Sequence, residues 1–284
     1  MTAVRHAIHT LLSLTLLGSL PLLAGADAGA TTNQKQPEKI RDNLFLLEEA
    51  YNQEPGVIQH IQSFTLQPRT KSWNYTFTEE WPVPTDRHQL SLTIPASNSG
   101  EFGRSGVGDF LINYRFQAIG MGGTGRLAMA PRVSLVLPTG RYQTGAGRGG
   151  TGIQLDLPVS IELGDHFVTH LNAGLTATPN AKSQSGYSAA ALDTNAGAAL
   201  VWLTRTWFNP LVEVVHLTTQ EIGDDRTRTR RSNFIVNPGL RFAINCRSSL
   251  QIVPGISMPI LFGSGTRGSV LFYLSFEHAV WRPR

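Results

Sequence analysis

Polar and charged side chains recur at every second position along several long segments of this chain. Such groups can bind a solute or select it by charge and hydrogen bonding. Gln154, Asp156 and Glu162, for example, alternate with isoleucine and leucine. Because successive side chains of a β-strand point to opposite faces, this pattern gathers the polar groups on one face. The side chains that we expect to line a common interior are Asn113, Arg115, Gln117, Arg132, Gln154, Asp156, Glu162, His170, Asn172, Asp193, Asn195, Glu213 and Arg241.

The charges of these candidate residues are unevenly distributed along the chain. Basic groups come early and late, and the acidic groups lie between them. Opposite walls of unlike charge would place a transverse field across a pore and filter polar solutes, as charged rings do in channels. The alternative is a lattice of ion pairs that only stiffens the wall. The two interpretations differ in whether Arg115 and Arg132 affect ion selectivity.

Covalent and metal chemistry find little support in the spacing of other candidate residues. His166 and His170 would lie about 13 Å apart on one face of a strand, too far to share a zinc ion. Ser134 could be combined with His170 and Asn172 as a hydrolytic triad, but a triad is defined by its geometry. The glycine-rich stretch 145–152 lacks the Lys-Ser/Thr ending of a phosphate-binding loop. We therefore expect no enzymatic activity, no metal and no cofactor.

The start of the chain has the composition of an export signal. Arg5 precedes an apolar run over residues 11–23 and the sequence Ala24-Gly25-Ala26, an A-x-A cleavage pattern. After this leader no run of about 18 apolar residues occurs, which argues against transmembrane helices. The formal net charge of +4 is too small to imply nucleic acid as a partner. The single cysteine, Cys246, excludes an internal disulfide.

The alternating segments are long enough to cross a bilayer as strands. A strand of about 11 residues, rising roughly 3.3 Å per residue and tilted by about 40°, climbs about 28 Å, close to the thickness of the apolar core. From the third strand onward, long and short connections alternate, as in outer-membrane barrels. The pattern predicts an all-β fold, an antiparallel transmembrane β-barrel of about 12 strands. The expected ranges are 57–66, 72–81, 87–94, 107–119, 126–137, 151–163, 166–177, 190–203, 206–217, 231–244, 248–257 and 268–277.

The cost of placing charge in lipid decides which face points outward. Sliding the strand pairing by one residue would turn Arg115, Arg132 and Arg241 towards lipid, at roughly 2–4 kcal/mol each near the midplane, or about 6–12 kcal/mol in total. The apolar face must therefore meet the membrane. A soluble β-sandwich with its apolar face inward is the alternative, but its strands would be shorter.

The segment before the first strand predicts a second feature of the fold. An apolar stripe at helical spacing runs from Ile40 to Tyr51, which predicts a short helix over 37–52. We expect this segment to enter the barrel mouth as a partial plug, with Glu48 and Glu49 meeting interior arginines and Tyr51 as a further plug residue. A periplasmic helix or a flexible leader is the alternative. The expected organisation is a signal peptide at 1–26, a plug or periplasmic segment at 27–56, and a barrel at 57–284.

The block NLFLLEEAYNQEPGVIQHI, residues 43–61, resembles the opening of a family of outer-membrane transporters named for the MetA (meta-cleavage) pathway of phenol degradation. Further similarities lie in WNYTFT (73–78), EWPVP (80–84), GDF (108–110), APRVSL (130–135) and LPTG (137–140). The resemblance covers nearly all of the mature chain. It implies an outer-membrane barrel that passes small hydrophobic compounds.

These observations together predict a channel or transporter for small, hydrophobic or aromatic compounds in the outer membrane of a Gram-negative bacterium. A non-conducting barrel with a structural or hydrolytic role is the alternative. The expected partners are outer-membrane lipid and lipopolysaccharide, the barrel-assembly machinery, for which the aromatic last strand is a signal, and a small-molecule solute, but no nucleic acid. Arg226, Arg228, Arg230 and Arg231 fall in one predicted external loop. They would either contact lipopolysaccharide phosphates or be solvated.

Overall fold

The computed structural model describes residues 40–98, 105–120, 125–246, 250–263 and 266–280, and the predicted signal peptide and residues 27–39 lie outside this part of the chain. Within it, no helix is long and apolar enough to cross a membrane. A short 3-10 turn, η2, spans Tyr142–Thr144. The strands are β1 (Val57–Gln67), β2 (Ser72–Pro82), β3 (His88–Asn98), β4 (Ser105–Val107), β5 (Phe110–Phe116), β6 (Leu127–Met129), β7 (Arg132–Leu137), β8 (Gly152–Leu163), β9 (Phe167–Lys182), β10 (Ser188–Trp202), β11 (Phe208–Ile222), β12 (Arg228–Phe242), β13 (Ile244–Asn245), β14 (Leu250–Ser257), β15 (Ile260–Phe262), β16 (Arg267–Gly268) and β17 (Val270–Ala279).

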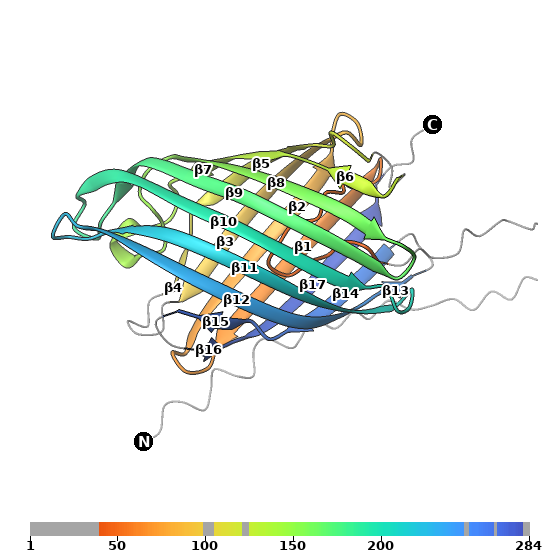
Figure 1. Ribbon diagram of the computed structural model, residues 1–284. Helices are drawn as coiled ribbons and strands as arrows, with labels where there is room; N and C mark the ends of the chain where they lie inside the picture. Colours follow the sequence, from red (N-terminus) through yellow and green to blue (C-terminus); the bar gives the residue numbers. More distant parts are fainter. Residues whose placement is uncertain (1–39, 99–104, 121–124, 247–249, 264–265, 281–284) are drawn as a thin grey trace, which may run out of the picture. The chain divides into compact units, whose positions relative to one another are not determined.

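These strands form one closed antiparallel wall (Figure 1). β1 pairs with β2 along one edge and with β17 along the other, so the sheet closes on itself. Five positions of the wall consist of two strands that follow one another across a short break: β4 with β5, β6 with β7, β12 with β13, β14 with β15, and β16 with β17. The barrel therefore has 12 wall strands, which confirms the predicted fold class.

Some strands are longer than the hydropathy pattern predicts. β9 has 16 residues, and β10, β11 and β12 have 15 each. The long loops predicted at 178–189 and 218–230 are therefore wrong in extent, because only residues 183–187 and 223–227 connect these strands. The ends of β9, β11 and β12 that extend into these predicted loops are polar and show no apolar alternation. Their backbones still pair with the neighbouring strand, as Thr219 does with Arg231.

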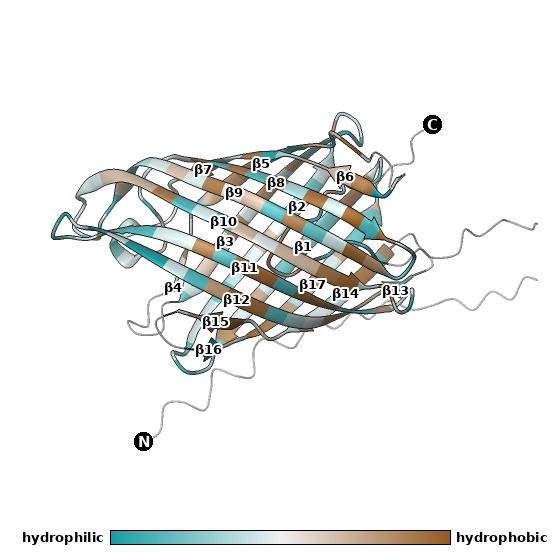
Figure 2. Cartoon of the chain, viewed as in Figure 1, coloured by the Kyte–Doolittle hydropathy of each residue, from teal (hydrophilic) through white to brown (hydrophobic). Residues whose placement is uncertain are grey.

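Apolar and polar residues alternate along single strands of the wall (Figure 2), and their exposure shows which face each set occupies. On β8, Ile153 and Leu155 are 53% and 47% exposed, whereas Asp156 and Ser160 are buried. Arg115 and Arg241, whose orientation decided the register, are 4% and 0% exposed. The apolar residues therefore face away from the lumen, in the predicted register.

Residues 40–56, which we call the inner segment, lie inside the barrel and lead into β1 (Figure 1). They contain bends and a turn, so the helix predicted over 37–52 is wrong for its described part, 40–52. Asn43 has a left-handed backbone, with φ at 66°, which a helix does not tolerate. Wall side chains also bind the backbone N–H groups that helical hydrogen bonds would need.

Candidate functional site

A buried glutamate of the wall holds the turn of the inner segment. Oε1 of Glu213, on β11, accepts hydrogen bonds from three successive backbone N–H groups. Phe45, Leu46 and Leu47 donate them at 3.2, 2.9 and 3.0 Å. Oε2 of Glu213 accepts a fourth hydrogen bond from Nδ2 of Asn237 at 2.7 Å. Backbone N–H groups that converge on one anion form a nest, and each charge-assisted bond contributes roughly 1.5–3 kcal/mol.

Two deeply buried arginines bind carbonyl oxygens of the inner segment. Arg115, on β5, donates from Nη1 to the carbonyl of Glu49 at 3.2 Å and from Nη2 to that of Tyr51 at 2.7 Å. Arg241, on β12, donates from Nη2 to the carbonyl of Ile40 at 2.8 Å. These guanidinium groups therefore meet the backbone of the inner segment, and not the carboxylates of Glu48 and Glu49 as expected; the carboxylate near Arg115 is that of Glu80, with Oε2 3.8 Å from Nη2.

Glu48 makes the predicted contact with an interior arginine. Its Oε1 lies 2.6 Å from Nη2 of Arg132, and the same Nη2 is 3.7 Å from Oδ2 of Asp156. Glu49 has no ion pair with another described residue. Burial and, to a smaller extent, the Asp42 carboxylate raise the pKa of Glu49 to about 8. This arrangement pairs interior charges locally and favours the ion-pair lattice over two walls of opposite charge.

Amide side chains of the wall pair with the inner segment as a neighbouring strand would. Oδ1 of Asn172 accepts the N–H of Glu48 at 2.9 Å, and Nδ2 donates to the carbonyl of Glu48 at 2.7 Å. Oε1 of Gln117 accepts the N–H of Asn52 at 2.8 Å, and Nε2 donates to the carbonyl of Ala50 at 2.7 Å. The wall thus satisfies backbone groups that the irregular segment cannot pair internally.

The three residues considered as a hydrolytic triad have separate partners. Nδ1 of His170 lies 2.8 Å from Oγ of Ser160, which also accepts the N–H of Ala50 at 2.8 Å. Ser134 accepts a hydrogen bond from Nη1 of Arg132 at 2.8 Å. The third candidate, an asparagine, binds the inner segment as described above. Among the described residues, no three His, Cys, Asp or Glu side chains are placed to hold a metal ion.

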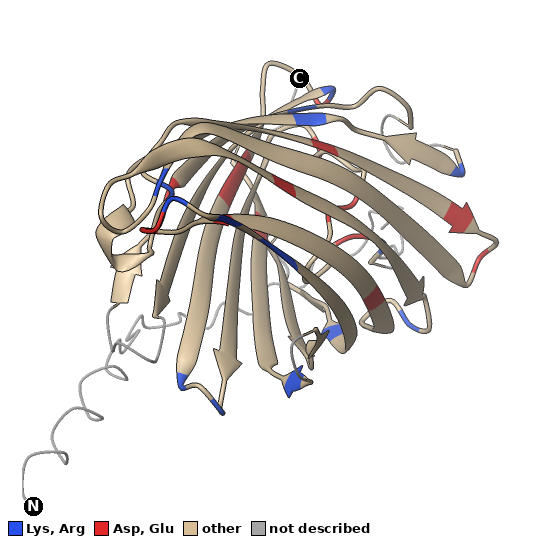
Figure 3. Cartoon of the chain, turned by 60° about the vertical axis from the view of Figure 1, so that its left-hand side comes forward, with Lys and Arg blue, Asp and Glu red and all other residues tan. Residues whose placement is uncertain are grey.

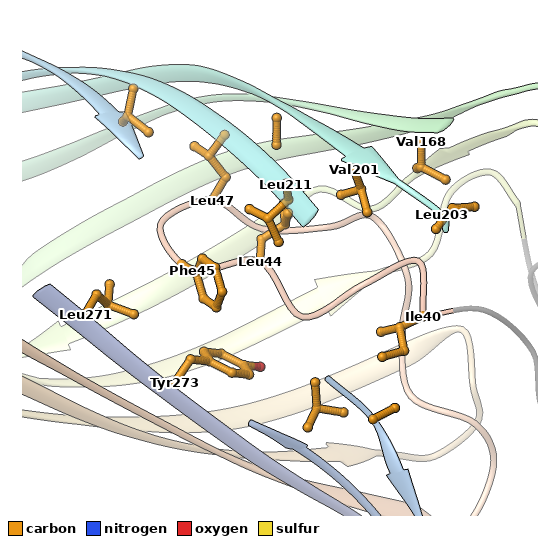
Figure 4. Close-up of a cluster of buried hydrophobic side chains, with 14 residues drawn as sticks. Ile40, Leu44, Phe45, Leu47, Val168, Val201, Leu203, Leu211, Leu271 and Tyr273 are labelled. Carbon is orange, nitrogen blue, oxygen red and sulfur yellow. The ribbon is translucent and has the colours of Figure 1, made fainter. Parts of the chain in front are cut away.

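A small apolar core lies between the inner segment and the wall (Figure 4). The ring of Phe45 packs edge-on against Tyr273, with centroids 5.6 Å apart. It also lies over Gly239 and Gly255, where a Cβ would be 2.3 and 2.5 Å from ring atoms. These two glycines therefore form a recess for the ring. The buried cluster comprises Ile40, Leu44, Phe45, Leu47, Val168, Ala199, Val201, Leu203, Leu211, Val215, Ala243, Val253, Leu271 and Tyr273.

The inner segment leaves a polar gap against one side of the wall. A cavity of about 160 Å³ lies between residues 43–49 and strands β1, β2, β3, β5 and β7. Its wall side carries the hydroxyl groups of Ser63, Thr76, Thr78, Ser91 and Thr93. Arg115 and Arg132 also line it. Such a surface can hydrogen-bond water or a small solute.

A larger chamber, which we call the outer chamber, lies at the other end of the barrel from the start of β1, where the inner segment joins the wall. It has a volume of about 780 Å³ and is lined by the loop 138–151 and the outer parts of several strands. Arg148 of the loop pairs with Asp193 on β10 and donates to the carbonyl of Gln220 on β11 at 2.6 Å. Oδ1 and Oδ2 of Asp109 accept the N–H groups of Gly140 and Arg148 at 2.9 and 2.6 Å. The loop is thus tied to the wall on two sides.

The remaining predicted interior residues line the outer chamber, contact the inner segment or belong to the hydrogen-bond network of the wall. Gln154 and Asp193 line the chamber. Glu162 accepts a hydrogen bond from Nη1 of Arg41 of the inner segment at 2.6 Å. Asn113 and Asn195 belong to the wall network, bonding Nη1 of Arg132 at 2.9 Å and Oδ1 of Asp156 at 3.4 Å.

Sequence reasoning missed several residues that hold the inner segment. Gln89 accepts the N–H of Gln53 at 2.8 Å, and Nδ2 of Asn209 donates to the carbonyl of Ile40 at 3.1 Å. Oδ1 of Asn43 accepts hydrogen bonds from Gln59, Tyr273 and Ser275. Gln59, Gln89 and Asn209 are buried polar side chains on β1, β3 and β11. Applying the two-residue alternation to these strands would have found them.

A closed antiparallel barrel with an apolar outer face and a polar interior defines the class of outer-membrane β-barrels. Within that class, the chain belongs to the family described as MetA-pathway of phenol degradation, whose profile matches residues 58–255. This match confirms the resemblance that the sequence motifs suggested.

Solved structures share the fold at low sequence identity. An outer membrane channel from Pseudomonas putida F1 is 13% identical, with a TM-score of 0.57, over 81% of this chain and 97% of that one. The NanC porin is 9% identical, with a TM-score of 0.51, over 76% of this chain and 98% of that one. A search of curated proteins by sequence gave no match.

Proposed function

We propose that the protein is an outer-membrane channel for small molecules, narrowed by its own inner segment. The observation that carries this proposal is the segment's position inside a polar lumen, where wall side chains hold it beside a hydroxyl-lined gap of about 160 Å³. A purely structural barrel has no need of a gap and an outer chamber in series. The similar solved structures are a channel and a porin, which supports a transport role and not an enzymatic one.

We propose small compounds with an apolar ring or chain as solutes. The outer chamber combines the apolar side chains of Leu111, Val136 and Tyr142 with polar groups such as Gln154 and Thr176. A solute with one apolar face and one or two hydrogen-bonding groups fits such a lining. Membership of a family described by phenol degradation supports aromatic compounds within this class.

We further propose that residues 1–26 are cleaved during export, that the barrel-assembly machinery inserts the mature chain, and that lipid and lipopolysaccharide surround it. The exposed leucine, isoleucine and valine side chains of the outer face support contact with lipid. N-terminal sequencing of the protein purified from outer membranes tests the cleavage, and a start other than residue 27 would contradict this site.

The channel proposal is tested by conductance in planar bilayers. The full mature chain should give small, infrequent current steps, and a variant lacking residues 31–54 should give larger ones, because the deletion removes most of the inner segment. Liposome swelling with small aromatic acids, compared with a disaccharide, then tests the solute class. Absence of current from both proteins would overturn the channel and favour a non-conducting structural barrel. Equal current from both would refute the role of the inner segment alone.

A further inference from the structure

The β11–β12 hairpin carries a group of arginines that its strand register divides between two faces. Side chains on a strand alternate in direction, and on β12 the buried Asn237 and Arg241 mark the inward positions. Arg231 shares this inward direction and pairs with Glu221, with Nε 2.9 Å from Oε2. Arg228 and Arg230 point the opposite way, away from the lumen. Figure 3 shows the positive charge along the first part of this strand.

The outward arginines stand directly above the apolar belt. Phe234 shares their face, is 42% exposed, and packs against the ring of Phe262 on β15 with centroids 6.4 Å apart. Arg230 lies four residues further along the strand, about 13 Å at the usual rise, or about 10 Å in height for a strand tilted by about 40°. If the aromatic pair marks the edge of the apolar core, this height is that of the lipid headgroups. On β10, Leu192 is another exposed apolar neighbour on the outer face.

Among the described residues, neither Arg228 nor Arg230 has an ion pair. Glu221 is engaged by the inward arginine. At the tip, Asp224 accepts the N–H of Ser185 at 2.8 Å, and Asp225 accepts hydrogen bonds from Thr227. Within the described part of the chain, the pair therefore presents two guanidinium groups without an ion-pair partner at a membrane surface, near the aspartates of the hairpin tip.

We infer that Arg228 and Arg230 form a binding site for the phosphate groups of lipid A, the phosphorylated glycolipid of the outer leaflet. Guanidinium groups bind phosphate with two parallel hydrogen bonds and are well suited to partly desolvated positions. The exposed apolar side chains below them suit the acyl chains of the same molecule. The inference rests on the proposed outer-membrane function, with the hairpin at the external end that the connection lengths predict, but it does not depend on conduction.

The test is a titration of the detergent-purified mature protein with lipid A, followed by native mass spectrometry. The double variant Arg228→Gln/Arg230→Gln should bind lipid A at least about tenfold more weakly, because two bidentate contacts are lost and each factor of ten corresponds to only about 1.4 kcal/mol. Arg231→Gln is the matched control, with the same change of charge one position away on the inward face, and should stay within about twofold of the parent protein. Folded barrels migrate differently on gel electrophoresis before and after heating. This change in migration verifies that every variant is folded.

Two further probes separate the lipid from its phosphate group. Dephosphorylated lipid A should bind the parent protein as weakly as lipid A binds the double variant. Inorganic phosphate at millimolar concentration should not displace lipid A. Equal binding of lipid A by the parent and the double variant would overturn the site, and so would an equal loss in Arg231→Gln. Full displacement by inorganic phosphate would reassign it to free phosphate. A failure of conduction would leave these outcomes unchanged, so the two proposals are tested separately.

Discussion

Replacing Glu213 with alanine should release the inner segment from the wall. The carboxylate accepts the N–H groups of Phe45, Leu46 and Leu47 with one oxygen and the side chain of Asn237 with the other. Alanine removes all four acceptor contacts. The bound turn would then have to leave its site or remain without these partners, and a buried N–H without a partner is costly.

The size of the effect follows from the three backbone hydrogen bonds. Each bond to a charged acceptor contributes roughly 1.5–3 kcal/mol, and because neighbouring contacts are not additive we take about 4 kcal/mol for the set. At about 1.4 kcal/mol for each factor of ten, the ratio of undocked to docked inner segment should rise roughly a thousandfold. Glu213→Gln keeps an acceptor oxygen but loses the charge, so its effect should be smaller.

Single-channel recording and trypsin cleavage after Arg41 measure the two consequences. Arg41 is bonded to Glu162 in the docked segment, so Glu213→Ala should accelerate cleavage and increase the frequency of large current steps. His216→Ala is the matched control, because His216 lies on the same strand, faces away from the lumen and bonds Ser232 of the wall. If cleavage and current in Glu213→Ala equal those of the control, the reasoning from this nest of hydrogen bonds is wrong.

Three other perturbations test separate parts of the interior. Gly255→Val should displace the ring of Phe45, since even a Cβ would lie 2.5 Å from it, and should raise conductance and lower the melting temperature; Phe45→Ala in the same chain should relieve the clash and recover part of the melting temperature, and no recovery would contradict the recess. Because the pKa of Glu49 is raised to about 8, the docked state binds a proton more tightly than the free segment, whose carboxyl has an ordinary pKa of 4.5. Docking should therefore weaken as pH rises from 4.5 to about 8, with large current steps becoming more frequent; a Glu49→Gln chain should lose this dependence, and its persistence would refute the assignment. Arg148→Ala removes the pair with Asp193 and should free the loop 138–151, which faster proteolysis of the loop would report; unchanged protection would show that the Asp109 contacts suffice.

The wall of the barrel was predictable because lipid constrains its outer face. Most outward positions within the membrane carry apolar side chains, so a two-residue period survives in the sequence along strands such as β8, although β1 and β2 also place His60, Gln62 and Glu79 outward. Beyond the membrane this constraint no longer applies. The strand ends at 178–182 and 218–222 are polar and were read as loops, although backbone hydrogen bonds continue there independently of side-chain type.

The inner segment was predictable in its place but not in its conformation. Its apolar residues and acids suggested a plug, and Glu48 does meet Arg132. Helical spacing, however, reports only where apolar side chains recur, and here they pack into separate recesses such as the one under Phe45. The choice between helix and irregular chain depends on which acceptors the backbone N–H groups find. Those acceptors are wall residues tens to more than 100 positions away, 65 for Gln117 from Asn52 and 166 for Glu213 from Leu47, and local sequence contains no information about them.

The same contacts determine how firmly the inner segment, the proposed plug, is held. Where both partners are neutral, as with Asn172 and Gln117, each bond to the wall can be exchanged for one with water, and the net cost of each exchange is small. The bonds to the charged Glu213 cost more to exchange. The apolar core around Phe45 has no such substitute and loses its burial on release. We therefore expect the charge-assisted bonds of Glu213 and the aromatic recess together to set how strongly the segment is held, and the neutral amide pairs to set where it docks.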